Sequence, residues 1–225
     1  MTKREIIYVG DPMCAWCFGF APVLDALMTE FQSEATFRFI MGGLRVDNPI
    51  AITPEIRPAL QKNWNGVTRT TGQVIHGHLL DEAPEFLYDS FPASRAFVTV
   101  RTLAEEMALP YYKALHEAFY LHLTDITNHE ELCRIALPLG IDEGQFKKRV
   151  DSASIHGETR QDFSTAVTYN AQAFPALVLK EGEHAAILNQ GYKPFETLAP
   201  HIRSWIKGEL KTSQITPALL IFGRL

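Results

Sequence analysis

The chain lacks the features that mark several common classes of protein. It holds only three cysteines in 225 residues, too few for a framework of structural disulfides. No apolar run reaches the roughly 18–20 residues that a membrane-spanning helix needs. There is no lysine- and arginine-rich run, and the net charge is −5. We therefore expect a protein without a membrane span and without nucleic acid as a partner.

The first residues of the chain do not resemble a secretion signal. Residues 1–5 are mostly polar and lead directly into a short apolar run, without a long apolar region or a small-residue cleavage site. If Met1 is the native start, we expect a soluble protein in the cytoplasm. Because that compartment is reducing, a close pair of cysteines indicates a redox or metal-binding role rather than a structural disulfide.

Such a pair is present, since only two residues separate Cys14 from Cys17. The apolar run at residues 6–9 reads as a buried strand, and residues 14–31 have helical apolar spacing. The pair thus falls on the first turn of a helix that leaves the carboxyl end of a strand. Backbone N–H groups there have no partner within the helix, so we expect them to stabilise a thiolate at an exposed Cys14. This placement predicts thiol–disulfide chemistry.

The apolar patterns divide the chain into a core and an insertion. With 46% hydrophobic residues, the chain can bury one large core, or a core plus an inserted domain. Residues 1–45 read as strand, helix and parallel strand, and residues 171–210 as a β-hairpin followed by a helix. Residues 46–170 are helical in pattern, and residues 211–225 form a tail. This order predicts an α/β fold, a thioredoxin-like core with an inserted all-helical domain.

Helix start signals set the expected boundaries within the insertion. The Thr-Pro-Glu sequence at residues 53–55 offers an N-cap, a proline at N1 and an acid in the first turn. A second helix opens at Pro92, and we expect it to stop before Pro110. Residues 65–91 read mainly as loop. Two further helix starts resemble capping boxes, at Asn128 and Asp142.

These features together resemble the DsbA-like branch of the thioredoxin superfamily, most closely its cytosolic, FrnE-like disulfide isomerases. The resemblance is carried by residues 11–17 with the cysteine pair, by the helical insertion, and by the Ala-Phe-Pro-Ala-Leu-Val sequence at residues 173–178. It implies that Cys14 attacks a disulfide and that Cys17 resolves the resulting mixed disulfide. It implies no bound cofactor. Disulfide-containing proteins or glutathione are the expected partners, and the protein is expected to be a monomer or a homodimer.

The resemblance also implies how a substrate is held. A cis peptide bond should precede Pro175, which faces the cysteine pair, while the backbone of Phe174 pairs with an extended substrate chain. Most relatives have a small or β-branched residue before this proline, so the bulky Phe174 is a departure. Trp16, between the two cysteines, is expected to be exposed and to offer substrates an apolar contact.

A second departure concerns proton transfer. Many relatives carry a buried acid six residues before the first cysteine, where it accepts a proton from the resolving thiol. This chain has Tyr8 at that position. Asp11 is nearer in sequence, but it is expected in the loop before the helix. The sequence identifies no group that replaces the acid.

Zinc binding is the main alternative for the cysteine pair, because Cys-X-X-Cys is also half of a tetrahedral metal site. The other ligands would have to come from Cys133 or from His76 and His78, none of which has the paired spacing of a zinc ribbon or finger. The lone Cys133 reads instead as a small core residue, and the two histidines as loop residues.

A different enzyme class also shares the inserted fold. Glutathione-dependent kappa-class transferases and chromene-carboxylate isomerases act on small electrophiles and need only one active-site serine or cysteine. The second cysteine, Cys17, counts against that function. At the other end of the chain, the apolar run at residues 218–222 is expected to pack onto the body or to form a dimer contact.

Overall fold

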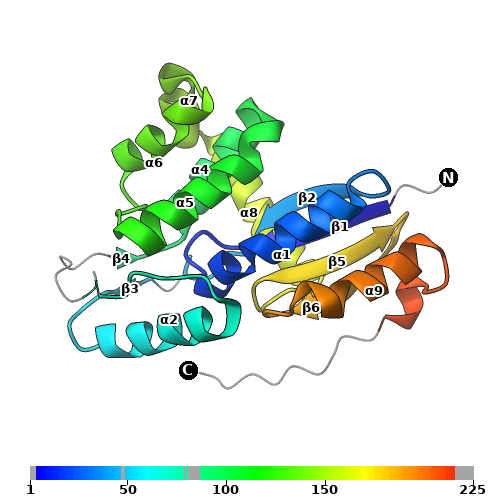
Figure 1. The fold of residues 1–225 in the computed structure, drawn as a ribbon. Helices are drawn as coiled ribbons and strands as arrows, with labels where there is room; N and C mark the ends of the chain where they lie inside the picture. The colour runs from blue at the N-terminus through cyan, green and yellow to red at the C-terminus, as the bar shows by residue number, and fades with distance from the viewer. Residues whose placement is uncertain (1–3, 47–48, 79, 81–86, 216–225) are drawn as a thin grey trace.

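The computed structural model describes residues 4–46, 49–78, 80 and 87–215. A four-stranded mixed sheet lies at its centre (Figure 1). In spatial order the strands are β2 (Thr36–Met41), β1 (Arg4–Gly10), β5 (Ala176–Glu181) and β6 (His184–Gln190). β1 and β2 run parallel, whereas β5 is antiparallel to both of its neighbours. The predicted strand–helix–strand unit and the predicted hairpin are confirmed.

Both faces of the sheet are covered by helices. These helices are α1 (Ala15–Phe31), α8 (Ala153–Thr168) and α9 (Phe195–Ile206). Ile6 and Tyr8 of β1 pack in one cluster with α1 and α9, and Ile7 and Val9 pack on the other face with Ala166 of α8. Successive side chains of a strand point to opposite faces, so a central strand covered on both sides is apolar throughout.

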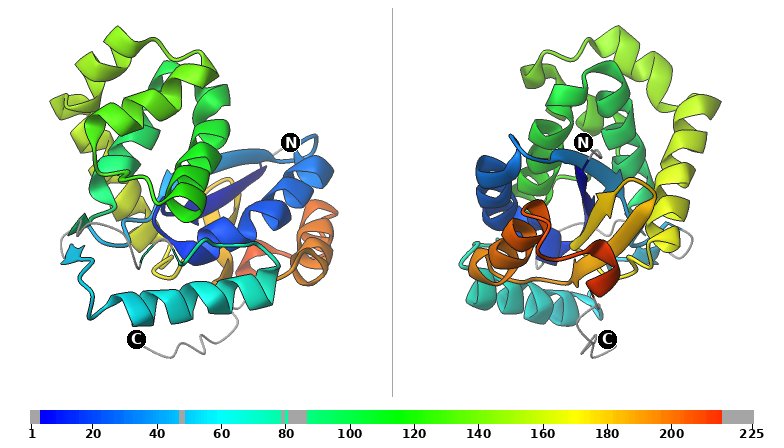
Figure 2. Two further views of the ribbon diagram at one scale, coloured as in Figure 1. Left: turned by 60° about the vertical axis from the view of Figure 1, so that its left-hand side comes forward. Right: turned by 90° about the vertical axis from the view of Figure 1, so that its right-hand side faces the viewer.

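Between β2 and β5 the chain is largely helical, which confirms the predicted fold class. Besides α8, the helices there are α2 (Arg57–Thr71), α4 (Phe91–Leu103), α5 (Ala108–His122), α6 (His129–Ala136) and α7 (Glu143–Val150). Single 3-10 turns occur at η1 (Glu105–Met107), η2 (Leu137–Leu139) and, after α9, η3 (Thr212–Gln214). In Figure 2, α4–α7 stand together at one end of the molecule and α2 lies apart from them. None of the described helices is both long and apolar enough to cross a membrane.

The inserted segment also contains an element that the sequence did not predict. β3 (Ile50–Ala51) pairs antiparallel with β4 (Leu87–Tyr88) to form a short ribbon separate from the main sheet. Each strand is only two residues long, too short to produce an alternating pattern that sequence analysis could detect.

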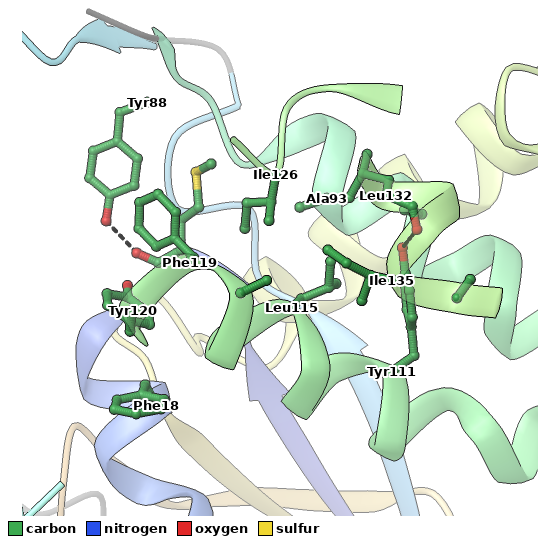
Figure 3. Packing of buried hydrophobic residues seen from close by; sticks show 14 of the residues in the cluster. Phe18, Tyr88, Ala93, Tyr111, Leu115, Phe119, Tyr120, Ile126, Leu132 and Ile135 are labelled. Carbon is green, nitrogen blue, oxygen red and sulfur yellow. Dashed lines mark hydrogen bonds between the residues drawn. The ribbon is translucent and has the colours of Figure 1, made fainter. Parts of the chain in front are cut away.

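The helical block has a buried cluster of its own (Figure 3). Tyr111, Leu115 and Phe119 follow one another at four-residue spacing on α5 and pack in this cluster with Leu132 of α6. The Tyr111 hydroxyl donates a hydrogen bond to the carbonyl of Leu132 at 2.8 Å. Cys133 is buried in the same cluster, which confirms its interpretation as a core residue.

The first predicted helix start is wrong. Residues 53–55 do not cap α2, which begins at Arg57 with Ile56 as its N-cap and no side-chain cap. A proline in a turn and a proline at a helix start give the same signal in a sequence, and here residues 54–56 form a turn. α2 also runs into residues 65–91, which were expected to be mainly loop. It ends at Thr71, and the φ of +78° at the following Gly72, its C-cap, is accessible to glycine without strain.

The second predicted helix is in fact two. α4 ends at Leu103 because Ala104 adopts an extended conformation, with φ of −154° and ψ of 93°. α5 then passes through Pro110, which is tolerated because N–H groups in the first turn have no helical partner. The N-caps predicted at Asn128 and Asp142 are confirmed, since each side chain accepts a hydrogen bond from a backbone N–H of the following turn.

The division into a core of residues 1–45 and 171–210 and an insertion of residues 46–170 stays a proposal. α8 lies within the insertion by number, although it covers one face of the sheet. In the tail of residues 211–225, η3 lies beside β6. The apolar run at residues 218–222 falls outside the described residues.

A buried carboxylate joins α4, α8 and β2. Asp162 is 4% exposed, and its two oxygens accept hydrogen bonds from the Arg101 guanidinium at 2.8 and 3.1 Å. The backbone N–H of Met41 donates to the same carboxylate at 3.0 Å, and Arg101 donates to the carbonyl of Phe39 at 2.8 Å. The helical segment is therefore fixed to the edge strand of the sheet by charge as well as by apolar packing.

Asp162→Ala should lower the free energy of unfolding by about 3 kcal/mol, because it leaves the Arg101 charge without its partner in a partly buried site. Urea denaturation would measure the change. The matched control is Asp25→Ala, since Asp25 pairs with Lys113 at the surface, where an ion pair contributes less than about 1 kcal/mol. Equal losses in the two variants would contradict the structural role assigned to Asp162.

Candidate active site

The two cysteines of the pair lie at the start of α1. Cys14 is the N-cap residue, with φ of −91° and ψ of 110°, and its side chain makes no capping hydrogen bond. Its carbonyl accepts the backbone N–H groups of Cys17 at 2.9 Å and Phe18 at 3.1 Å, which closes the first turn. Both cysteines are free thiols. The predicted location at the first turn of the first helix is therefore correct.

The predicted exposure of Cys14 is wrong. Cys14 is only 5% exposed and Cys17 only 1%, so neither presents an open sulfur to solvent. The surroundings of Cys14 do not favour the expected thiolate either. A hydrogen bond between the two thiols, followed by burial, raises the pKa of Cys14 well above its usual range. The sequence predicted the position of Cys14 at a helix N-terminus. It did not predict that a distant loop covers the sulfur.

That covering loop contains Phe174 and Pro175, which are joined by a cis peptide bond, as expected. The Cys14 thiol donates to the carbonyl of Phe174, with 3.7 Å between sulfur and oxygen. The loop is held in turn by Gln190 of β6, whose side-chain oxygen accepts the backbone N–H groups of Gln172 at 3.0 Å and Ala173 at 3.1 Å. Residues 160 positions apart in the chain thus meet at the cysteine pair.

The bulky side chain of Phe174 is accommodated by a glycine. A Cβ added at Gly42, just after β2, would lie 2.2 Å from atoms of the Phe174 ring. The ring therefore rests directly on the backbone at the end of β2, a close approach that only a residue without a side chain permits. The bulky Phe174 can therefore occupy this position because residue 42, on which its ring packs, is a glycine.

Trp16 is partly buried rather than exposed. Its ring lies 6.3 Å from the ring of Tyr192, and it packs at the margin of both the sheet cluster and the helical cluster. The side chain of Trp16 is thus close to the cysteine pair, but part of its surface is buried by packing within the protein. A substrate contact at Trp16 stays a proposal.

Asp11 lies beneath the pair and is fully buried. Its carboxylate accepts the backbone N–H groups of Met13 at 2.9 Å and Leu44 at 2.7 Å. Burial outweighs these hydrogen bonds and raises the pKa of Asp11 to about 6. The expectation that Asp11 lies in the loop before α1 is correct, but the sequence did not indicate that it is buried.

Sequence analysis missed several aromatic residues around the pair. Tyr112 and His116 of α5 both contact the carbonyl of Asp11, each at 3.2 Å, and Tyr112 lies 3.4 Å from Tyr8 between hydroxyl oxygens. Tyr88 of β4 donates to the carbonyl of Met13 (Figure 3). Tyr112, His116 and Tyr120 are spaced four apart, and residues at that spacing share a face of a helix. This spacing could have predicted that the three side chains lie together.

The other candidate ligands are not brought to the pair. Cys133 belongs to the helical cluster, whereas Cys14 and Cys17 belong to the sheet cluster. His76 and His78 lie beside each other, with ring centroids 5.6 Å apart, and Nδ1 of His76 is 2.8 Å from the carbonyl of Leu121. Within the described part of the chain, no three His, Cys, Asp or Glu side chains form a group that could hold a metal ion.

Comparison with known proteins agrees with this geometry. The family model of the DSBA-like thioredoxin domain matches residues 5–203, which is most of the chain. The chain belongs to the DsbA family. The resemblance drawn from the cysteine pair and the late proline is therefore confirmed.

Among solved structures, this DsbA-family chain is similar to a candidate protein disulfide isomerase from Nitrosomonas europaea. The identity is 32%, the TM-score is 0.83, and the match covers 92% of this chain and 98% of the other. The cytosolic disulfide reductase DsbM from Pseudomonas aeruginosa shares the fold at 18% identity and a TM-score of 0.71, over 91% of this chain and 98% of its own. DsbM has also been solved with GSH.

A curated relative is the ClpXP adapter protein SpxH from Halalkalibacterium halodurans. It is 25% identical over 178 residues, which make up 77% of this chain and 58% of SpxH. The chain therefore spans little more than half the length of that relative.

Asp11 should make stability depend on pH. Because its pKa is raised from 3.8 to about 6, its contribution is complete below about pH 4 and is lost as the pH rises through 6. Relative to Asp11→Asn, the parent should lose roughly 3 kcal/mol of unfolding free energy between about pH 4 and 7. Urea unfolding at several pH values would measure this difference. Parallel stability curves for the two proteins would contradict the raised pKa.

Proposed function

We propose that the protein is a thiol–disulfide oxidoreductase that acts on protein or glutathione disulfides through Cys14 and Cys17. The observation that carries the proposal is the contact between the Cys14 thiol and the carbonyl of Phe174, at 3.7 Å, beside a cis bond to Pro175. A pair of thiols at a helix start and a loop backbone next to them are the two parts that disulfide exchange with a peptide needs.

The proposed cycle has two exchange steps. The thiolate of Cys14 attacks one sulfur of the substrate disulfide, and the other substrate sulfur leaves with the bonding electrons and takes up a proton. The thiolate of Cys17 then attacks the Cys14 sulfur of the mixed disulfide and releases the second substrate thiol. The pair ends as a disulfide, and two electrons have passed to the substrate.

The ionisation of the pair favours reduction of substrates as the net direction. DsbA is a strong oxidant because its reduced form is stabilised. Here the pKa of Cys14 is raised by its hydrogen bond with Cys17 and by burial, so the reduced pair gains no stability from a thiolate at Cys14. A cytoplasmic location agrees with this direction, as does the similarity to a protein named a cytosolic disulfide reductase.

Substrates would contact three residues around the pair, namely Trp16, Phe174 and Pro175. The backbone of Phe174 is adjacent to Cys14, where an extended chain could add as a short strand. Glutathione is a second proposed partner, either as a small disulfide substrate or as the source of electrons. The structure of DsbM with GSH supports this choice for a protein of the same fold. The cycle requires no bound cofactor.

Cys17→Ser should trap the intermediate of this cycle. Serine keeps the approximate shape of cysteine but is a poor nucleophile towards sulfur, so the first attack by Cys14 should survive and the release should not. Mixing this variant with oxidised glutathione or a disulfide-containing protein should give a covalent adduct on most molecules, reversed by dithiothreitol. Intact-protein mass spectrometry would measure the adduct.

Two variants control this experiment. Cys14→Ser should form no adduct, and Cys133→Ser should behave like the parent, because Cys133 lies in a different buried cluster. A Cys17→Ser protein that traps nothing across several disulfides would contradict the dithiol cycle. If that variant also kept full turnover on small electrophiles, the glutathione-dependent transferase or isomerase would be the better assignment.

A further inference from the structure

The hydroxyl of Tyr8 lies beside the thiol of Cys17, at the inner end of the cysteine pair. Both residues are about 1% exposed and belong to the same buried cluster, and Cys17 is close enough to Tyr8 to raise the pKa of its hydroxyl. The ring of Phe20 stacks on the ring of Tyr8, with centroids 6.1 Å apart and planes 14° from parallel. The tyrosine is thus held next to the sulfur that must attack during release.

Tyr8 is also the first member of a line of hydroxyl groups. Its oxygen is 3.4 Å from that of Tyr112, and the Tyr112 hydroxyl donates to the carbonyl of Asp11 at 3.2 Å. That bond uses the only proton of Tyr112. The single proton of Tyr8 therefore has two acceptors within reach, the oxygen of Tyr112 and the sulfur of Cys17.

The backbone is shaped to allow this arrangement. Gly10 is the last residue of β1, and a Cβ added there would lie 2.4 Å from the hydroxyl oxygen of Tyr112 and 2.5 Å from a ring carbon of Tyr8. A side chain at position 10 would push the two tyrosines away from each other. The contact between the hydroxyls thus depends on a glycine in an otherwise apolar strand.

Tyr8 cannot act as the buried acid acts in relatives that have one. Burial and the nearby charge of an ionised Cys17 raise the pKa of Tyr8 well above its ordinary value. Burial and the same charge raise the pKa of Tyr112. Both hydroxyls therefore keep their protons while Cys17 ionises, so Tyr8 can donate a hydrogen bond but cannot accept the proton of the thiol.

We propose that Tyr8 is a further catalytic residue, a hydrogen-bond donor that stabilises the thiolate of Cys17 during substrate release, and that Tyr112 is the residue that positions it. The inference rests on the proposed function, because release by Cys17 is a step of that cycle. Hydrogen bonds to an ionised group are about twice as strong as those between neutral groups, and burial of both partners preserves that strength.

The step balances without a further reactant. The thiol of Cys17 gives its proton to solvent, and the resulting thiolate attacks the sulfur of Cys14. The bond between Cys14 and the substrate sulfur breaks, and that sulfur leaves with the electron pair and takes a proton from solvent. Tyr8 donates its hydrogen bond to Cys17 before the attack and is chemically unchanged afterwards.

Other titratable groups surround the pair, and a test must separate their effects. The pKa of Asp11 is raised to about 6 and that of His116 is lowered to about 4, both chiefly by burial. Between about pH 7 and 10, Asp11 is therefore charged and His116 neutral throughout. The groups left to titrate or to donate in this window are Cys14, Cys17, Tyr8, Tyr112 and Tyr88.

The direct test is the ionisation of Cys17 itself. In a Cys14→Ser, Cys133→Ser background, the pH dependence of the alkylation rate, followed by intact-protein mass spectrometry, reports on Cys17 alone. Tyr8→Phe should raise the pH midpoint of this titration by about one unit, a tenfold loss of thiolate at neutral pH. Tyr112→Phe should move the midpoint in the same direction by less. Circular dichroism melts would establish that each variant is folded.

Kinetics provide a second readout on the full dithiol protein. The mixed disulfide of Cys14 with glutathione is formed, and its release by Cys17 is followed in a single turnover. In Tyr8→Phe, release should be about threefold slower at neutral pH, because a tenfold loss of thiolate is partly offset by the greater nucleophilicity of a more basic sulfur. At alkaline pH, where Cys17 is fully ionised, release should be about threefold faster than in the parent.

The pH profiles of the release rate in the parent and in Tyr8→Phe should therefore cross. A merely structural effect of the substitution would not make them cross. Tyr111→Phe is the matched control, since it removes a buried hydroxyl from the helical cluster, and it should leave the profile unchanged. A Tyr8→Phe titration midpoint equal to the parent's, or a release rate lowered equally at every pH, would overturn the proposal. If Tyr8→Phe does not fold, an unchanged Cys17 midpoint in Tyr112→Phe would overturn it. A Cys17→Ser protein that forms no mixed disulfide would refute the proposed function instead.

Discussion

The arrangement around the cysteine pair depends on the backbone carbonyl of Asp11. This oxygen accepts the N–H of Cys14 at 3.0 Å and the hydroxyl of Tyr112 at 3.2 Å, and it lies 3.2 Å from Nε2 of His116. The carboxylate of the same residue binds the N–H of Leu44, beyond the end of β2. One residue therefore sets the start of α1, holds α5 against β1 and fixes the segment that follows β2. Removing any of these contacts would leave buried polar groups unpaired.

Around this point the protein disfavours negative charge. Burial raises the pKa of Asp11 and of Tyr8, and the contact between the two thiols raises that of Cys14. In the proposed cycle the sulfur of Cys17 ionises in the interior of the protein. The neutral hydroxyl of Tyr8 can then donate a hydrogen bond to it. A buried thiolate is unfavourable unless a partner stabilises it. The position of Tyr8 next to Cys17 provides such a partner.

Much of the fold could be predicted from the sequence because its signals are local. The alternation and apolar runs of β1, β2 and the β5–β6 hairpin, and the N-caps at Asn128 and Asp142, all act within a few residues. The cysteine pair was found from its spacing and its place after a strand, and the cis-proline loop through family resemblance. The break after Leu103 and the burial of Cys14 could not be found, because each depends on segments distant in sequence. Tyr8 was recognised only as a departure, since its partner Tyr112 lies on α5, a helix that the sequence analysis did not predict separately.

The contacts of Tyr112 and His116 have a consequence for how the molecule could change through evolution. Both residues belong to α5, within the helical insertion, yet they complete the surroundings of cysteines that belong to the sheet. A thioredoxin-like core without residues 46–170 would keep its Cys-X-X-Cys sequence. It would lose the contacts that Tyr112 and His116 make beside the pair. The insertion thus contributes to the surroundings of the cysteine pair, and under the proposed function a change in how α5 packs would alter the reduction potential of that pair without touching a cysteine.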